Sequence, residues 1–222
     1  MKHFKSVLIF ILLFTSLVGG DRIAIATKVI GNVQYIRGDG SGRSLKKGHI
    51  FESGDILKTD KGGFVALLFI DDKTALKVKG NSEIIIAGKR SAQAIAKEIN
   101  LNGGTIRAQV RKQKKGDFVV RTSVSVASVK GTDFWLVSNK AGDSLIGLEG
   151  IVSFSNLISG ESIDITTGNS GISTLEGSVK SFKTDPKTIP DDPSDTGSGT
   201  QKLEIEFMDA SGKKKILIIE YN

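Results

Sequence analysis

The chain has 222 residues, a formal charge of +7, 39% hydrophobic residues and no cysteine. This length and apolar fraction suit a folded domain with its own core and exclude a disordered chain. The missing cysteines exclude a disulfide framework, a thiol nucleophile, a cysteine-ligated metal and a lipid-modified cysteine.

The first twenty residues are typical of a secretory signal peptide. A positively charged start precedes the apolar run 7–18, which is shorter than the roughly 20 residues that span a bilayer. Cleavage can follow Gly20 or Ala26, and we favour Gly20 because the later cut would remove Ile23 from the first strand. We therefore expect an exported protein, periplasmic or extracellular in the cell envelope, without a transmembrane segment in the mature chain. The alternative is that the apolar run stays attached as an uncleaved N-terminal anchor. Loss of two signal lysines lowers the formal charge from +7 to +5.

Residues 21–180 predict a single all-β domain, a β-sandwich or β-roll of many short strands. The chain has 26 glycines, only three prolines and no sustained helical period, a mixture that suits short strands joined by tight turns. Residues 91–98 are ambiguous between strand and loop. The expected strands are 23–36, 63–70, 74–78, 81–87, 99–110 paired with 118–126 and carrying Gly103-Gly104 as a turn or bulge, 145–154, 163–166 and 172–175.

The C-terminal part predicts a linker and then a β-hairpin. Residues 181–201 contain all three prolines together with Asp, Ser and Gly, which indicates a flexible linker. Residues 202–222 hold two apolar strands around Asp209-Ala-Ser-Gly212. An isolated hairpin is marginal in water, so it docks on the main sheet, pairs with a partner or frays. We expect docking.

A series of weak motifs in a fixed order resembles the FecR domain family. Gly31-Asn-Val-Gln-Tyr-Ile-Arg37 resembles its first strand, and Leu101-Asn-Gly-Gly-Thr-Ile106 a later element. The signature turn is Lys130-Gly-Thr-Asp-Phe134, with lysine where arginine is more usual. The closing motif is Leu148-Glu-Gly-Ile-Val152. The family-motif residues are Gly48, Gly54, Asp55, Thr59, Lys130, Gly131, Thr132, Phe134, Glu149 and Gly150.

The resemblance covers about residues 28–155 and implies an extracytoplasmic domain that senses or contacts other proteins and carries no chemistry of its own. FecR-type regulators of iron transport place an anti-sigma segment and a transmembrane helix before this domain. Here a signal peptide precedes it directly, so the resemblance does not support signalling across the inner membrane. The motif residues are expected to be structural.

Trp135 is the candidate contact residue. It follows Phe134 in one strand, so the two side chains face opposite sides. The family keeps an aromatic residue at Phe134, which we assign to the core, and this leaves Trp135 for an exposed contact. Alternatively, Trp135 covers the edge of the core under a loop.

No catalytic, cofactor-binding or metal-binding residue is predicted. His49, the only histidine of the mature chain, lies between two turn glycines, which favours a structural role over catalysis. Asp192-Pro-Ser-Asp-Thr-Gly197 imitates the start of a calcium loop, but its twelfth position is Leu203 instead of glutamate. Gly38-Asp-Gly-Ser-Gly42 lacks the helix that a phosphate loop needs.

The sequence therefore predicts a non-enzymatic envelope module that works by protein–protein contact. The basic runs Arg111-Lys-Gln-Lys-Lys115 and Lys213-Lys-Lys215 are most simply solubilising loops. The alternative is that they hold an anionic envelope polymer such as a glycan or peptidoglycan. Nucleic acid is not expected as a partner, because no basic surface with stacking aromatics is predicted.

Overall fold

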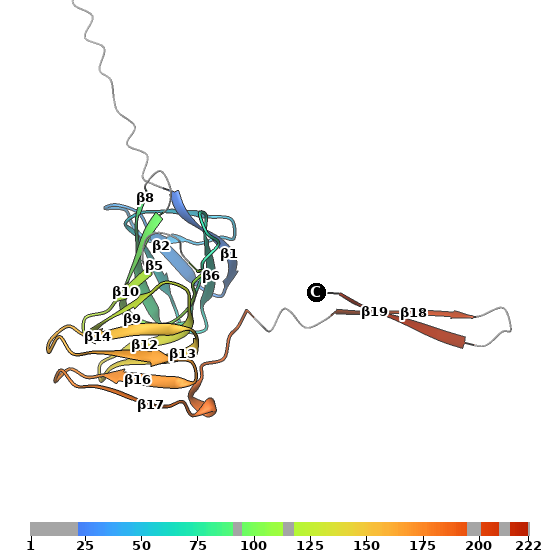
Figure 1. The fold of residues 1–222 in the computed structure, drawn as a ribbon. Helices are drawn as coiled ribbons and strands as arrows, with labels where there is room; N and C mark the ends of the chain where they lie inside the picture. The colour runs from blue at the N-terminus through green and yellow to red at the C-terminus, as the bar shows by residue number, and fades with distance from the viewer. Residues whose placement is uncertain (1–21, 91–94, 113–117, 195–200, 209–213, 222) are drawn as a thin grey trace, which may run out of the picture.

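The computed structural model describes residues 22–90, 95–112, 118–194, 201–208 and 214–221 (Figure 1). Strands and turns dominate, and the predicted all-β fold is confirmed. The strands are β1 (Arg22–Ile30), β2 (Val33–Ile36), β3 (Arg43–Ser44), β4 (Ile50–Glu52), β5 (Asp55–Thr59), β6 (Phe64–Phe69), β7 (Ala75–Val78), β8 (Ser82–Arg90), β9 (Ile95–Gln109), β10 (Phe118–Arg121), β11 (Ser125–Val129), β12 (Asp133–Asn139), β13 (Gly142–Glu149), β14 (Ile151–Asn156), β15 (Ser162–Thr166), β16 (Asn169–Ser173), β17 (Val179–Lys183), β18 (Gln201–Met208) and β19 (Lys214–Tyr221).

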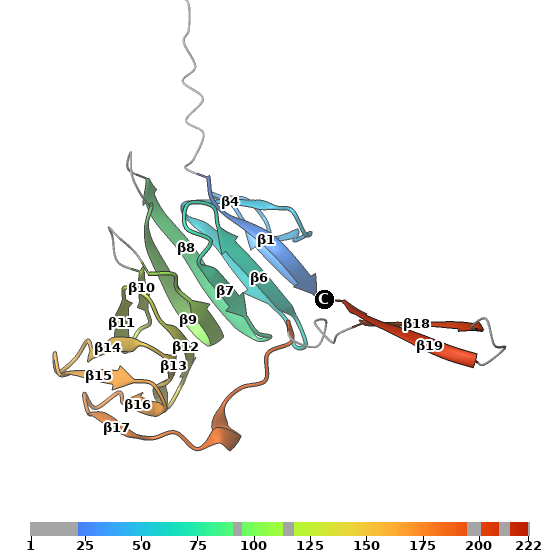
Figure 2. The same cartoon turned by 45° about the vertical axis from the view of Figure 1, so that its right-hand side comes forward.

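The first seventeen strands form two layers, which Figure 2 shows from a second side. Layer 1 has the order β4-β1-β6-β7-β9-β12-β13-β16-β17. Layer 2 has the order β3-β2-β5-β8-β9-β10-β11-β14-β15. All neighbours are antiparallel except β9 and β10, which are parallel.

Strand β9 belongs to both layers. Its first half, up to Gly103, pairs with β8 and β10 in layer 2, and its second half, from Gly104, pairs with β7 and β12 in layer 1. The two glycines have φ values of 146° and 113°, which side chains with a Cβ rarely adopt. A Cβ on Gly104 would lie 2.1 Å from the Ser82 Oγ. The expected turn or bulge at Gly103-Gly104 is thus the point where one strand changes layer.

The hydrophobic core fills the space between the layers. Phe69 of layer 1 meets Phe118 of layer 2 edge to face, with ring centroids 5.9 Å apart. Phe134 is fully buried in the same core, as the sequence predicts. Five of the six residues of strand β6 are buried, so side chains on both faces of this strand are shielded from solvent.

Several sequence expectations concern the ends of the fold. The predicted signal peptide and residues 91–94 of the ambiguous segment lie outside the described residues, while 95–98 begin β9. Strand β17 continues to Lys183, and a short 3₁₀ helix, η1 (Pro186–Thr188), follows within the segment expected as a linker. The predicted C-terminal hairpin forms as β18 and β19, which make a two-stranded sheet of their own. Its docking and the domain limits remain predictions.

Candidate binding site

Two places where the chain crosses between the layers lie against each other at one end of the domain. Residues 130–132 connect β11 in layer 2 to β12 in layer 1, and Gly150 connects β13 in layer 1 to β14 in layer 2. A Cβ on Gly150 would lie 2.7 Å from the Gly131 carbonyl oxygen, and its φ of 80° also favours glycine. A Cβ on Gly131 would lie 3.0 Å from the Lys112 Cα. The signature turn and the closing motif therefore need glycine because two crossing backbones touch.

The end of β9 completes this junction. The Val110 N–H donates to the Thr132 carbonyl at 2.7 Å, and the Thr132 N–H returns a bond to the Val110 carbonyl at 3.1 Å. These bonds extend the pairing of β9 with β12 and hold the crossover at the ends of two interior strands of layer 1. They also place the basic residues Arg111 and Lys112 next to the signature turn.

The junction borders a groove of about 820 Å³. Its lining combines cationic and acidic side chains with an apolar rim residue, Ile151, whose surface is 56% exposed. The Thr132 Oγ1 is buried there without a hydrogen-bond partner among the described residues. The lining residues are Gln109, Val110, Arg111, Lys112, Lys130, Gly131, Thr132, Asp133, Glu149, Gly150 and Ile151. We call this the crossover groove. The structure thus brings five motif residues together at one concave surface.

Other motif residues stabilise the crossing from β4 to β5. Gly54 turns the chain with φ 95°, and the buried Asp55 then accepts from the Arg37 Nε at 2.8 Å, the Arg37 Nη2 at 2.7 Å and the Glu52 N–H at 2.9 Å. The hydrogen bond to Asp55 raises the pKa of Arg37. This bidentate pair is a structural contact, since it cross-links β5 to the end of β2.

Gly48 and Thr59 have equally local tasks. Gly48 turns with φ 89° and donates its N–H to the Ala26 carbonyl at 2.8 Å. Thr59 Oγ1 donates to the Lys79 carbonyl at 2.6 Å and accepts from the Ser82 N–H at 3.0 Å. Both residues tie turns to neighbouring strands and lie outside the crossover groove.

His49 packs between two aromatic rings. Its ring centroid lies 3.9 Å from that of Tyr35 and 4.9 Å from that of Phe51, and its buried Nε2 has no hydrogen-bond partner in the part of the chain that the structure describes. Burial, followed by the charge of Arg37, lowers the pKa of His49. The side chain is a packing element rather than a base positioned by hydrogen bonds.

The expectation that Trp135 is an exposed contact is wrong. Its surface is only 1% exposed. It points away from the core, as expected opposite Phe134, but the Nζ of Lys79 and the guanidinium of Arg107 both lie 5.8 Å from its ring. The alternative interpretation, in which Trp135 covers the edge of the core under a loop, agrees with its burial but does not predict Lys79 and Arg107 as its neighbours.

Trp135 belongs to a row of side chains that crosses the outer face of layer 1. Each residue of this outer row is paired in register with the next. The row contains three cations, one aromatic ring near its middle and another at its end. It consists of Lys28, Ala66, Lys77, Arg107, Trp135, Ile146, Ser170 and Phe182.

Residues 184–194, which we call the strap, run back along this row from layer edge to layer edge. At its start Thr184 donates its N–H to the Gly168 carbonyl at 3.0 Å, and its hydroxyl lies 2.8 Å from that of Ser170 in β16. At its end the Lys28 Nζ of β1 donates to the carbonyl of Pro193 at 3.1 Å. The strap therefore spans most of layer 1, although its sequence is typical of a flexible linker.

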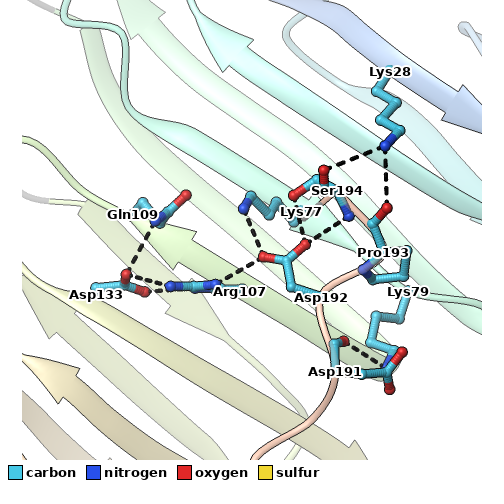
Figure 3. Close-up of polar contacts among 10 residues, drawn as sticks. All are labelled: Lys28, Lys77, Lys79, Arg107, Gln109, Asp133, Asp191, Asp192, Pro193 and Ser194. Carbon is cyan, nitrogen blue, oxygen red and sulfur yellow. Dashed lines mark hydrogen bonds and ion pairs between the residues drawn. The ribbon is translucent and has the colours of Figure 1, made fainter. Parts of the chain in front are cut away.

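Figure 3 shows that acidic strap residues meet the cations of the sheet. The Asp192 carboxylate accepts from the Lys77 Nζ at 2.6 Å and from the Arg107 Nη1 at 2.8 Å. The Lys79 Nζ donates to both the carbonyl, at 2.9 Å, and the carboxylate, at 2.5 Å, of Asp191. Asp192 is the central anchor, because its side chain is only 5% exposed.

The electrostatics favour the ionised form of Asp192. Burial opposes this charge, but hydrogen bonds from Lys77 and Ser194 outweigh it and lower the pKa of Asp192 from 3.8 to about 2. Its charge partner Arg107 is fixed by Asp133 through Nε–Oδ1 at 2.9 Å and Nη2–Oδ2 at 2.8 Å. Sequence reasoning missed this site, because Asp192 was considered only as part of a calcium loop and a linker.

The crossing glycines and the two-layered sheet define an all-β domain. Residues 55–153 match the family model described as FecR protein. The predicted resemblance to the FecR domain is confirmed over this part of the chain.

Two solved structures are similar to this chain, both from Parabacteroides distasonis and both provisionally assigned as an anti-sigma factor. The 2.50 Å structure has 12% identity and a TM-score of 0.51, over 70% of this chain and 69% of that chain. The 1.65 Å structure has 13% identity and a TM-score of 0.49, over 71% and 70%. The first of these likenesses shows a shared fold. A comparison with curated proteins gave no match.

Two further searches of the described residues concern membranes and metals. No helix within the described ranges is long and apolar enough to cross a membrane. The same residues contain no group of three or more histidine, aspartate or glutamate side chains with the arrangement of a metal site.

Proposed function

We propose that this chain is an exported, non-enzymatic FecR-like module that binds a protein partner in the periplasm or cell envelope, in a sensing or scaffolding role. The observation that carries the proposal is the crossover groove. Five of its lining residues are family-motif residues, so the feature that identifies the family also helps to shape the concave surface.

The composition of the groove suits a protein partner. Lys130 and Glu149 supply charges of opposite sign, Ile151 supplies an exposed apolar contact, and the buried Thr132 Oγ1 supplies an unpaired hydrogen-bonding group. Protein interfaces combine such an apolar contact with a polar rim. A surface for a uniformly anionic polymer would instead favour cations alone.

Export is supported by the N-terminal sequence together with the start of the fold. Strand β1 begins at Arg22 and buries Ile23, Ala24 and Ala26 almost completely. Cleavage after Gly20 would leave this strand intact, whereas cleavage after Ala26 would remove core residues.

The absence of enzyme chemistry is supported by the environment of the candidate residues. His49 is held between aromatic rings, and its lowered pKa results from burial rather than from a catalytic partner. A general base must lie beside the group whose proton it accepts, and His49 does not line the crossover groove.

The second candidate function is binding of an anionic envelope polymer. It is favoured by one observation, since Arg111 and Lys112 from the basic run 111–115 line the groove beside Lys130. Residues 113–117 lie outside the described residues. Polymer binding through these cations would weaken steeply with salt, whereas a mixed protein contact would weaken less.

The test is site-specific photo-crosslinking in the envelope fraction. A photo-reactive residue replaces Ile151 in the groove, and a matched control replaces Ile158, which is 63% exposed in the turn after β14. We expect a discrete protein adduct from position 151 that is absent from position 158 and persists at high salt. Adducts that are equal at both positions would refute the groove as the binding surface. Recovery of cell-wall material that is released by salt would favour the polymer.

A further inference from the structure

The outer row carries positive charge that the sheet balances only in part. Asp133 pairs with Arg107 from within layer 1, whereas Lys77 and Lys79 meet the carboxylates of Asp192 and Asp191 in the strap. If the strap lifted, Lys77 and Lys79 would lose these carboxylates, while Lys79 and Arg107 would still lie beside the ring of Trp135. Such a surface attracts an acidic occupant.

The lysines of the outer face bind backbone carbonyl groups of the strap as well as carboxylates, so their contacts suit a polypeptide and not only a negative charge. The Lys79 Nζ binds the backbone carbonyl and the carboxylate of the same residue, Asp191. The Lys28 Nζ binds the successive carbonyl oxygens of Pro193 and Ser194, at 3.1 and 3.4 Å. An anionic sugar or a free phosphate would lack these carbonyl groups at peptide spacing.

Asp192 is presented to the row by a local turn. Its Oδ1 accepts from the N–H of Ser194 at 2.9 Å and from the Ser194 hydroxyl at 2.6 Å. This leaves Oδ2 for the Lys77 Nζ and the Arg107 Nη1. The sequence Asp-Pro-Ser is therefore preorganised, because the proline restricts the backbone and the serine fixes the carboxylate.

The receiving side is also held in place by the sheet. Asp133 binds two nitrogens of Arg107 and accepts a bond from Gln109 at 3.1 Å, which directs the remaining Nη1 towards the strap. Asp133 belongs to the signature turn and Arg107 to β9, so this arrangement needs no strap residue. A site that is set by the sheet can receive another peptide of similar chemistry.

We propose that the outer face of layer 1, at Lys28, Lys77, Lys79 and Arg107, is a binding surface for an extended acidic peptide segment of a partner protein, with the chain's own residues 191–194 as its intramolecular occupant. The partner segment supplies a carboxylate at the place of Asp192 and backbone carbonyls at the places of Asp191 and Pro193. The proposal does not need a ligand in the crossover groove, although Asp133 and Gln109, which hold Arg107, also line that groove.

A tethered occupant makes the surface hard to detect in the intact protein. A short tether keeps its segment at an effective concentration on the order of millimolar. A competing peptide can bind only those molecules in which the strap is released. Its apparent affinity is therefore its intrinsic affinity multiplied by the fraction of molecules with a released strap. Weakening the strap should reveal the surface without changing it.

Trp135 provides the measurement, because it is the single tryptophan of the chain and lies under Lys79 and Arg107. The probe is a capped synthetic peptide with the sequence of residues 188–195. It is titrated into the full-length mature chain and into a variant in which residues 190–194 are replaced by Gly-Ser-Gly-Ser-Gly. The matched control peptide carries asparagine in place of both acidic residues at 191 and 192.

We expect the variant to show a shifted tryptophan emission and to bind the acidic peptide at least tenfold more tightly than the unchanged chain does. The control peptide should not bind, and Lys79→Gln in the variant background should weaken the acidic peptide. Failure of the peptide to bind a variant with a native circular dichroism spectrum would overturn the proposal. So would equal binding of the control peptide, or stronger displacement by a polyanionic glycan of equal charge. Exchange of straps between two copies, seen as a concentration-dependent dimer, would overturn the intramolecular occupant.

Discussion

Replacing Gly150 by alanine should destabilise the domain much more than a comparable substitution at Gly160. Both glycines have left-handed backbones, with φ 80° and 75°. A left-handed conformation costs an alanine roughly 1–2 kcal/mol, partly offset by a gain of about 0.4–1 kcal/mol from restricting the unfolded chain. This part of the effect is the same for both, and it leaves a net cost of about 1 kcal/mol at Gly160, where a Cβ meets nothing within 4 Å.

Gly150 has an additional cost from the close approach of the two crossovers. The new Cβ would lie 2.7 Å from the Gly131 carbonyl oxygen and 2.8 Å from the Thr132 Cγ2. Relieving such overpacking costs about 1–3 kcal/mol. We therefore expect a total loss of about 2–4 kcal/mol for Gly150→Ala.

The measurement is urea unfolding of both variants, followed by circular dichroism and tryptophan fluorescence. The midpoint should fall much further for Gly150→Ala, at an unchanged dependence on urea. In thermal unfolding, each kcal/mol corresponds to about 2–4 °C for a domain of this size. Equal losses in the two variants would show that backbone conformation alone explains the glycine, and the argument from touching crossovers would fail.

Three other predictions concern charged and titratable groups. Arg37→Ala should cost roughly 3 kcal/mol in chemical unfolding because it leaves the buried Asp55 without its cation; a loss below about 1 kcal/mol would contradict this. The depressed pKa of Asp192 means that its ionised form stabilises the bound strap above about pH 4. This stability should be lost as the pH falls through 4 towards 2. The loss should be visible as a change in Trp135 fluorescence emission, and the Asp192→Asn variant should not show this pH-dependent change. The pKa of His49 is also lowered in the folded state, so stability should be complete above about pH 6.5 and decline as His49 becomes protonated at lower pH. His49→Phe should flatten that decline in pH-dependent thermal unfolding, and an unaltered profile would contradict the assignment.

The motif glycines illustrate what the sequence could predict. The residues around Gly131 and Gly150 indicate turns and a family resemblance, because a turn motif is read from neighbouring residues alone. The structure adds that the two turns touch each other. The alternation of strands likewise predicted an all-β fold and a buried Phe134. Periodicity, however, could not show that β9 changes layer at Gly103, since a bulge within one sheet has the same local pattern.

Trp135 illustrates what the sequence could not predict. Its exposure depends on Arg107 and Lys79 and on the strap more than fifty residues later in the chain. The strap is rich in proline and aspartate, and this composition alone predicts a flexible linker. Here its carboxylates pair with Lys77 of β7, with Lys79 directly after β7 and with Arg107 of β9, and these long-range ion pairs have no sequence signal.

Because β9 is central to both layers, the folded unit extends well beyond the segment that identifies the family. A chain shortened to residues 55–153 would keep β9 and its neighbours but lose β1 and β2 on one side and β15 and β16 on the other. Four strands that are now interior, β5, β6, β13 and β14, would then present open rows of N–H and C=O groups. Unpaired strand edges are templates for aggregation. The family segment is thus a unit of recognition, whereas the continuous strand pairing reaches from β1 to β17.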